Sequence, residues 1–362
     1  MTPPPEEKTV SDDQHPAHRV AVIGAGLTGL TCARALGEMG CTVTVFDRGR
    51  RPGGRISTRR TEIGGSTACF DLGAPSFERP TGSFGIEVDR WIESGTASNW
   101  TPTEARWRGG MLEEISKTRD MVIGLPSMDA IPDRLAEGLA LESSTTVGGL
   151  ARTDGSWTLA VTPWREDERE AGPFDSIVLA MAAPQSARLL AGPAPDLACS
   201  LEPVRMSTTW VAILEIDDDG AGLPEVLHTP EAPILAKLIK ESGRPGRALT
   251  PGRTRWVIHA DDTWSGEQFD TERVKIAAIL ERQACELLGT ITGRSIRVTG
   301  STVAHRWGLA RSTETLEDRC LCDRELRLAV CGDGIGGSDI EACHLGGLAA
   351  AGCVESWSRP AE

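Results

Sequence analysis

Residues Arg19-Val-Ala-Val-Ile-Gly-Ala-Gly-Leu-Thr-Gly29 join an apolar run to a glycine-rich turn. The apolar half of this stretch, 19–23, is typical of a buried parallel strand, and its glycine half has the spacing G-x-G-x-x-G. A pattern with apolar residues on one helical face follows over 27–36. Between a strand and a helix, such glycines let the backbone turn tightly and approach a pyrophosphate, while the helix N-terminus supplies amide donors. The stretch therefore predicts a Rossmann-type dinucleotide site.

A second strand supplies the acidic partner of this site. The run Thr42–Phe46 ends in Asp47, about 20 residues after the glycines, where an acid accepts hydrogen bonds from the adenosine ribose. The alternative is a structural strand–turn–helix without a ligand. It explains the glycines but not the acid at this distance, so we favour a bound dinucleotide.

Two further runs favour a flavin over a nicotinamide dinucleotide. Asp47 is followed by Arg48 and by Gly53-Gly54-Arg55, a second glycine pair with a cation that suits another pyrophosphate contact. Far along the chain, Cys331-Gly332-Asp333 ends an apolar run and precedes a helical pattern over 339–357. Its acid can bind ribityl or pyrophosphate oxygens, and the helix N-terminus can face the flavin ring. No second G-x-G-x-x-G follows a strand, which argues against reductases with separate FAD and NADPH domains.

Composition excludes several classes of protein. A net charge of −14 argues against nucleic acid or an anionic membrane as the main partner, and no run approaches the roughly 20 apolar residues of a membrane span. The ten cysteines include no Cys-x-x-Cys and the six histidines lack ligand spacing, so no metal site and no disulfide reductase is expected. Tyrosine is absent, which excludes mechanisms that use its hydroxyl. We expect 1–18 to be a disordered tail and the protein to be cytoplasmic.

The remaining elements follow from periodicity and turn signals. Asp154-Gly155 between 145–150 and 157–162 predicts a hairpin. Helices are expected over 130–141, 186–190 and 272–288, and strands over 175–181, 210–216, 254–260, 296–304 and 326–331.

These motifs carry a resemblance. GAGLTGL (24–30), VFDRGRRPGGRISTR (45–59), FDLGA (70–74) and the final CGD before a helix resemble the FAD-dependent amine-oxidase superfamily. Stretches in the middle of the chain resemble its bacterial renalase-like branch, namely 124–130, 209–213, 242–247, 256–260 and 304–307.

The resemblance implies an α/β fold with a discontinuous Rossmann-type FAD-binding domain of the p-hydroxybenzoate-hydroxylase type, formed by 19–75, 121–191 and 299–358. A mixed-sheet α+β substrate domain would come from 76–120 and 192–298. FAD would be bound non-covalently. The residues that would hold it are Gly24, Gly26, Leu27, Thr28, Gly29, Asp47, Arg48, Gly54, Arg55, Gly73, Ala74, Val147, Gly332, Asp333 and Ile340.

Renalase-like enzymes take a hydride from off-pathway dihydro isomers of NAD(P), pass it through the flavin to O2 and release H2O2. The same activity is the first expectation here. The chain departs from the family pattern at Pro75-Ser76, at Glu241–Arg244 and at Gly308–Ala310, all expected to face the substrate. An amine oxidase or desaturase that tailors a secondary metabolite is therefore a second hypothesis, and a non-catalytic flavin-binding protein is a third.

Five residues are candidates for the substrate side. Arg306 and Trp307 are the expected catalytic residues, with Trp210, Lys237 and His259 behind them. Each has a structural alternative. The tryptophans fill a core, the arginine pairs with a surface carboxylate, the lysine extends to water along an apolar strip, and the histidine is a bonded strand residue.

Overall fold

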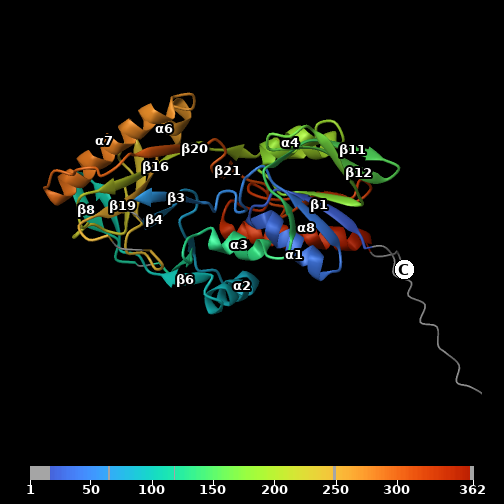
Figure 1. Cartoon of the computed structure of the whole chain (residues 1–362), viewed down its shortest axis with the longest axis horizontal. Coiled ribbons are helices and arrows are strands. Elements are labelled where there is room, and N and C mark those ends of the chain that lie inside the picture. Colours follow the sequence, from blue (N-terminus) through green and yellow to red (C-terminus); the bar gives the residue numbers. More distant parts are fainter. Residues whose placement is uncertain (1–16, 64–65, 118, 248–249, 359–362) are drawn as a thin grey trace, which may run out of the picture.

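The structure is a computed structural model that describes residues 17–63, 66–117, 119–247 and 250–358. Of the expected tail 1–18, residues 1–16 lie outside this part of the chain. Two large sheets occupy opposite ends of an elongated molecule (Figure 1).

The first sheet contains the strand that enters the glycine turn. Its strands are five parallel ones and an antiparallel edge strand, in the order β10 (Ala140–Glu142), β2 (Thr42–Phe46), β1 (Arg19–Ile23), β14 (Ser176–Leu179), β23 (Leu328–Val330) and β22 (Leu321–Asp323). The central strands β1 and β14 are apolar and almost wholly buried, because layers cover both faces of this sheet.

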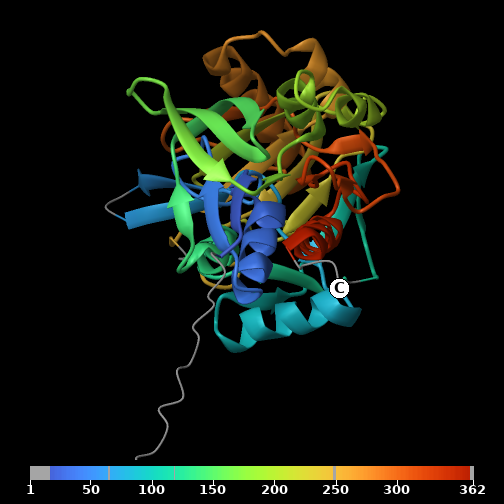
Figure 2. The same cartoon turned by 90° about the vertical axis from the view of Figure 1, so that its right-hand side faces the viewer.

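One face of this sheet is covered by helices and the other by a small sheet. Leu30 and Leu36 of α1 (Leu27–Glu38) share a core with Val354 of α8 (Ile340–Ser358), and α3 (Ala130–Ala136) adds to it. The two long helices run side by side (Figure 2). Trp157 and Leu159 pack on the other face. The elements there are β11 (Thr145–Thr153), β12 (Ser156–Pro163), β13 (Arg169–Phe174), α4 (Ala183–Leu190) and α5 (Pro195–Ser200).

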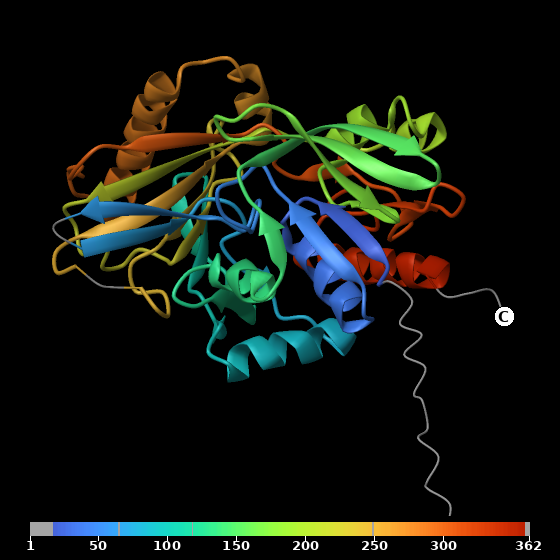
Figure 3. The ribbon, with the colours of Figure 1, turned by 45° about the vertical axis from the view of Figure 1, so that its right-hand side comes forward.

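The second large sheet is mixed. Its order is β20 (Val303–Trp307), β16 (Thr209–Ile216), β19 (Thr254–Ala260), β18 (Leu235–Lys240), β17 (Val226–His228), β7 (Glu104–Arg108) and β8 (Met111–Glu114), antiparallel except for the pair β17–β7. Helix α7 (Arg273–Thr292) packs on its outer face beside α6 (Asp262–Glu267). The hairpin of β3 (Thr58–Ile63) and β4 (Ser66–Asp71) covers part of the inner face (Figure 3).

Smaller elements complete the fold. A three-stranded sheet pairs β9 (Met121–Gly124) with β5 (Phe77–Glu78) and β6 (Ala97–Trp100), next to α2 (Gly82–Glu93). A short pair joins β15 (Arg205–Met206) to β21 (Ser312–Glu314). Among the helices in the described ranges, none is both long and apolar enough to cross a membrane.

The expected α/β fold with a mixed second sheet is confirmed, with two local corrections. The helix expected over 130–141 ends at Ala136, because Gly138 turns the chain at φ +77° and 140–142 pairs with β2 as a strand. The strand expected over 296–304 instead spans Val303–Trp307. This strand joins the second sheet although it belongs to the expected cofactor segment 299–358, and the domain boundaries stay a prediction.

Candidate functional site

The glycine turn between β1 and α1 is closed on one side and open on the other. Gly24 has φ +111°, and a Cβ there would lie 2.4 Å from the carbonyl oxygen of Ala180. A Cβ on Gly29 would lie 1.9 Å from the oxygen of Gly24. A Cβ on Gly26, the N-cap of α1, would meet no heavy atom of the described residues within 4 Å. Two glycines are therefore required by packing, and the third leaves the backbone accessible to a ligand.

The second glycine pair lies beside this opening. Gly53 donates its N–H to the oxygen of Ala25 at 2.8 Å and forms an isolated bridge with Gly26. Gly54 has φ +55°, and a Cβ there would lie 3.6 Å from the Cα of Gly26. Two backbone segments about 30 residues apart in the chain thus meet where a pyrophosphate is expected.

Asp47 ties the end of β2 to the glycine turn. Its Oδ2 accepts from the N–H of Ala25 at 2.6 Å and its Oδ1 from the N–H of Gly49 at 2.6 Å. Each carboxylate oxygen has a further lone pair, so the contact with a ribose stays a prediction. Arg48 is exposed, and Val147 lies in β11 two residues after Thr145, whose N–H bonds the oxygen of Asp47.

Arg55 and Asp333 come together from opposite ends of the chain. Arg55 Nη1 donates to Asp333 Oδ2 and, at 3.2 Å, to the oxygen of Ala310. The Asp333 side chain is only 3% exposed, and its Oδ1 is buried with no hydrogen-bond partner among the described residues. A buried acceptor without a donor costs about 1–3 kcal/mol. A ligand hydroxyl, such as those of the ribityl chain of FAD, fits this oxygen.

The segment 72–74 packs against Arg55. A Cβ on Gly73 would lie 1.7 Å from the oxygen of Arg55, and the N–H of Ala74 donates to that oxygen at 2.9 Å. Leu27 and Thr28 are buried in the first turn of α1, and Ile340 begins α8 and packs on the same core.

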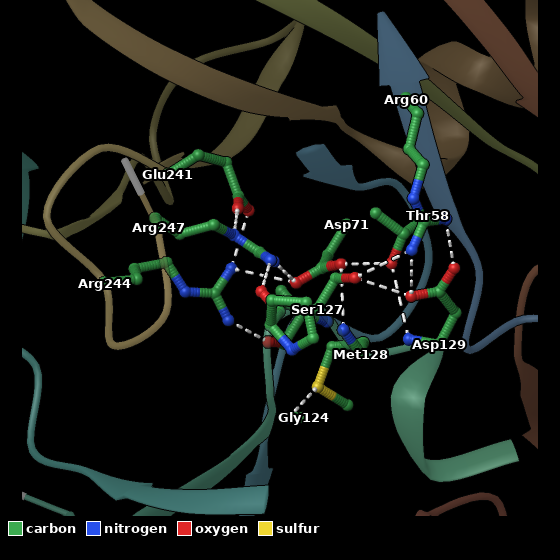
Figure 4. A network of polar contacts seen from close by, with 12 residues as sticks. Thr58, Arg60, Asp71, Gly124, Ser127, Met128, Asp129, Glu241, Arg244 and Arg247 are labelled. Atoms are coloured by element: carbon green, nitrogen blue, oxygen red, sulfur yellow. Dashed lines mark hydrogen bonds and ion pairs between the residues drawn. The ribbon is translucent and has the colours of Figure 1, made fainter. Parts of the chain in front are cut away.

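A buried charge network, which the sequence did not predict, flanks residues 72–74 (Figure 4). Asp71 Oδ2 accepts from Arg247 and, at 3.4 Å, from Arg244. Glu241 accepts from Arg244 Nη1 at 2.6 Å and from Arg247 Nε at 3.1 Å. None of the four side chains is more than 7% exposed.

This network reaches the candidate cofactor segment through Arg244, whose Nη2 donates to the oxygen of Pro75. Thr58 Oγ1 donates to Asp71 Oδ1 at 2.6 Å on the other side of the carboxylate. One acid followed by two arginines in Glu241–Arg247 was the available signal, but their partner Asp71 is about 170 residues away, and periodicity does not find such pairs.

Arg306 and Trp307 point to opposite faces of the second sheet, because neighbouring residues of a strand alternate. The Arg306 guanidinium lies 4.0 Å from the ring centroid of Phe269 and donates to its carbonyl oxygen on the outer face. Trp210 is buried there, and its Nε1 donates to the oxygen of Gln268 at 3.1 Å. These positions correct the expectation that Arg306 and Trp210 share a pocket with Trp307.

Trp307, Lys237 and His259 belong to the inner face. Trp307 Nε1 donates to the oxygen of Leu72 at 2.9 Å, next to Gly73. His259 pairs with Lys237 across β19 and β18, and its Nε2 is buried with no partner among the described residues. Burial, with Lys237 and Arg311 nearby, lowers the pKa of His259 to about 3, so the imidazole is neutral. Burial also lowers the pKa of Lys237.

The chain has the fold of the FAD-dependent amine oxidases, built on a Rossmann-like domain. The model of the NAD(P)-binding Rossmann-like domain matches residues 22–84. The structure is similar to a putative protoporphyrinogen oxidase from Exiguobacterium sp. 255-15, with a TM-score of 0.70 at 13% identity over 94% of this chain and 99% of that one. Cyclohexylamine oxidase from Brevibacterium oxydans IH-35A has a TM-score of 0.68 at 12% identity, over 94% and 99% of the two chains.

Similarity to curated sequences is confined to short segments. The chain is 46% identical over 66 residues to Lysine-specific histone demethylase 1 homolog 3 of Oryza sativa subsp. indica, which is 18% of this chain and 8% of that protein. It is 43% identical over 56 residues to a flavin-dependent L-tryptophan oxidase of Lentzea aerocolonigenes, which is 16% and 12%. The chain thus covers about a tenth of the length of these relatives.

Proposed function

We propose that this protein is an FAD-dependent oxidase that takes a hydride from a small substrate and passes the electrons to O2, releasing H2O2. The observation that carries this proposal is the buried Oδ1 of Asp333, which has no hydrogen-bond partner in the described part of the chain and therefore calls for a donor from a bound group. The open backbone at Gly26 and the adjoining Gly54 supply the matching place for a pyrophosphate.

Different residues of the protein have separate roles in binding the cofactor. Bound FAD supplies the acceptor for the hydride. Arg55 neutralises Asp333 and stays partly exposed at 31%, so its guanidinium is also available to a phosphate. The amides at the start of α1 and the residues Asp47, Gly54 and Gly332 bind and orient the dinucleotide. Trp307 connects the second sheet to the segment 72–74 through its hydrogen bond to the oxygen of Leu72.

Two substrate classes remain candidates. A dihydro isomer of NAD(P) is favoured by the renalase-like stretches of the middle of the chain. A small amine is favoured by the names of similar proteins, which include cyclohexylamine oxidase and an L-tryptophan oxidase. In both, a hydride leaves a carbon activated by a nearby nitrogen, so little acid–base help is needed from the protein. A flavin-binding protein without catalysis would reoxidise slowly in air and accept neither class.

The cofactor assignment is tested first, on purified protein reconstituted with FAD. We expect a flavin spectrum with about one FAD per chain, and we expect Asp333→Asn to lose FAD at least tenfold more readily. Glu166→Gln changes an exposed carboxylate in the turn between β12 and β13 and is the matched control, with no expected effect. Equal FAD retention by Asp333→Asn and the control would contradict the assignment.

The substrate class is tested by anaerobic stopped-flow absorbance at the flavin band. The protein is mixed with dihydro-NAD isomers in one series and with cyclohexylamine and L-tryptophan in another. Rapid bleaching that air reverses, with peroxide released, identifies the accepted class. The oxidase proposal would be contradicted if no compound bleaches the flavin and if the flavin reoxidises slowly after reduction by dithionite.

A further inference from the structure

The inner face of the second sheet carries a row of nitrogen-bearing side chains across three adjacent strands. His259 of β19 is directly opposite Lys237 of β18, which is directly opposite His228 of β17. Their chain neighbours Ile258, Leu238 and Leu227 point into the core under α7. Since strand residues alternate between faces, the row points away from α7, toward the hairpin β3–β4 and the first sheet.

The face that carries this row meets the candidate cofactor segment, because Leu72 packs in one cluster with Val257, two residues before His259 on β19. Arg311 is close enough to lower the pKa of both His259 and Lys237, after the larger effect of burial. The preceding residue, Ala310, accepts a hydrogen bond from Arg55, and Arg55 binds Asp333. The row therefore faces the place where a substrate would meet the cofactor.

The charges around Lys237 are compensated, whereas Lys237 itself is not. Glu104 is bound by Arg119 Nη2 at 2.8 Å and by His228 Nε2 at 2.9 Å. Arg311 pairs with Asp262 at 2.7 Å, and Arg244 pairs with Glu241 at 2.6 Å. Among the described residues, the amine of Lys237 has neither an ion-pair partner nor a hydrogen-bond acceptor, although the side chain is partly buried. Burial alone favours the neutral amine, and an anion beside it would favour the protonated, charged form.

We infer that Lys237 and His259 bind a carboxylate of the substrate. The inference rests on the proposed function and narrows its substrate class to small molecules that carry a carboxylate near the oxidised carbon. The amine of Lys237 supplies the charge, and neutral His259 donates its Nε2–H, a tautomer that the free Nε2 permits. The same cation opposes substrates with a positively charged tail, such as diamines, although putrescine oxidase shares the fold at a TM-score of 0.63.

The test is a calorimetric titration of the FAD-loaded protein with benzoate and indole-3-acetate, repeated with their neutral amides benzamide and indole-3-acetamide. We expect the carboxylates to bind and to perturb the flavin band, and the amides to bind at least tenfold more weakly. Lys237→Met is expected to weaken carboxylate binding at least tenfold, and Lys237→Arg to retain part of it. Lys240→Met is the matched control on the same strand, because its amine donates to the oxygen of Leu223 instead.

Several outcomes would overturn the inference. These are equal affinity for acids and amides, carboxylate binding that Lys237→Met leaves unchanged, and binding of ADP-ribose with no binding of either carboxylate. His259→Phe provides a second variant if Lys237→Met does not fold, and it is expected to weaken carboxylate binding alone. Failure of the protein to retain FAD would overturn the proposed function instead. The two failures can be distinguished, because calorimetry detects carboxylate binding even without a flavin signal.

Discussion

Removing Arg244 is expected to destabilise the protein strongly. Its side chain is fully buried and pairs with Glu241 and Asp71, each 1% exposed. In Arg244→Met the two carboxylates share Arg247 as their remaining cation, and the oxygen of Pro75 loses its donor. Breaking a buried ion pair by removing one partner costs about 3–5 kcal/mol. Since about 1 kcal/mol lowers Tm by about 2–4 °C in a large domain, the expected fall is about 6–20 °C.

The assay is thermal and urea unfolding followed by circular dichroism and tryptophan fluorescence. Arg90→Met is the surface control, because its pair with Glu87 leaves the arginine 69% exposed and contributes at most about 1 kcal/mol. In the double variant Glu241→Met/Arg244→Met, the pair Asp71–Arg247 remains balanced. This variant should therefore be more stable than Arg244→Met alone.

Two results would refute this reasoning. One is a loss in Arg244→Met no larger than in Arg90→Met, which would mean that burial does not make this arginine essential. The other is additivity in the double variant, which would mean that the uncompensated carboxylate is not the cause of the loss.

Three further predictions follow from single positions. Gly347→Ala should cost at least about 1–3 kcal/mol, because its Cβ would lie 2.4 Å from the oxygen of Thr28 where α8 crosses α1. On the same helix, a Cβ on Gly352 would meet no atom of the described residues within 4 Å, so Gly352→Ala should stabilise the protein by up to about 1 kcal/mol. Urea unfolding of both variants tests this, and equal midpoints would contradict the packing argument. Glu104 is buried, which raises its pKa, but hydrogen bonds from Arg119 and His228 more than reverse this and hold the pKa below the ordinary 4.5. The stabilising effect of the ionised carboxylate is therefore complete above pH 4.5 and is lost as the pH falls through the lower pKa of Glu104 in the folded state. Glu104→Gln should therefore flatten the acid side of a Tm–pH profile. A profile parallel to that of the unchanged protein would contradict this prediction. Hydrogen bonds, first from Cys320 and then from Cys322, outweigh burial and lower the pKa of Cys353 to about 6. Iodoacetamide at pH 7 should therefore modify Cys353 before the exposed Cys199. Peptide mass spectrometry measures the order of modification, and the reverse order would contradict the prediction.

Elements with local sequence signals could be predicted. The hairpin at Asp154-Gly155 is present as β11 and β12, and the helix expected over 272–288 is present as Arg273–Thr292, with Glu272 as its N-cap. The expected helix over 130–141 ends early because Gly138 turns the chain and the last two residues, Ala140 and Leu141, pair with β2. Such pairing depends on a strand about 100 residues earlier, which no local pattern reports.

The strand, glycine turn and helix of residues 19–38 could be predicted from the amino-acid sequence, and together they predict the Rossmann-type fold. A Cβ on Gly29 would meet the nearby oxygen of Gly24, which is a local contact, whereas a Cβ on Gly24 would meet Ala180, the residue after β14. Which candidate residues come together depends on how distant segments pack. The tertiary structure brought Arg55 to Asp333 and Trp307 to Leu72, and it turned Arg306 and Trp210 to the outer face. The physical reason is that a shift of one residue in a strand exchanges its two faces, and ion pairs between distant segments form only once the sheets have packed.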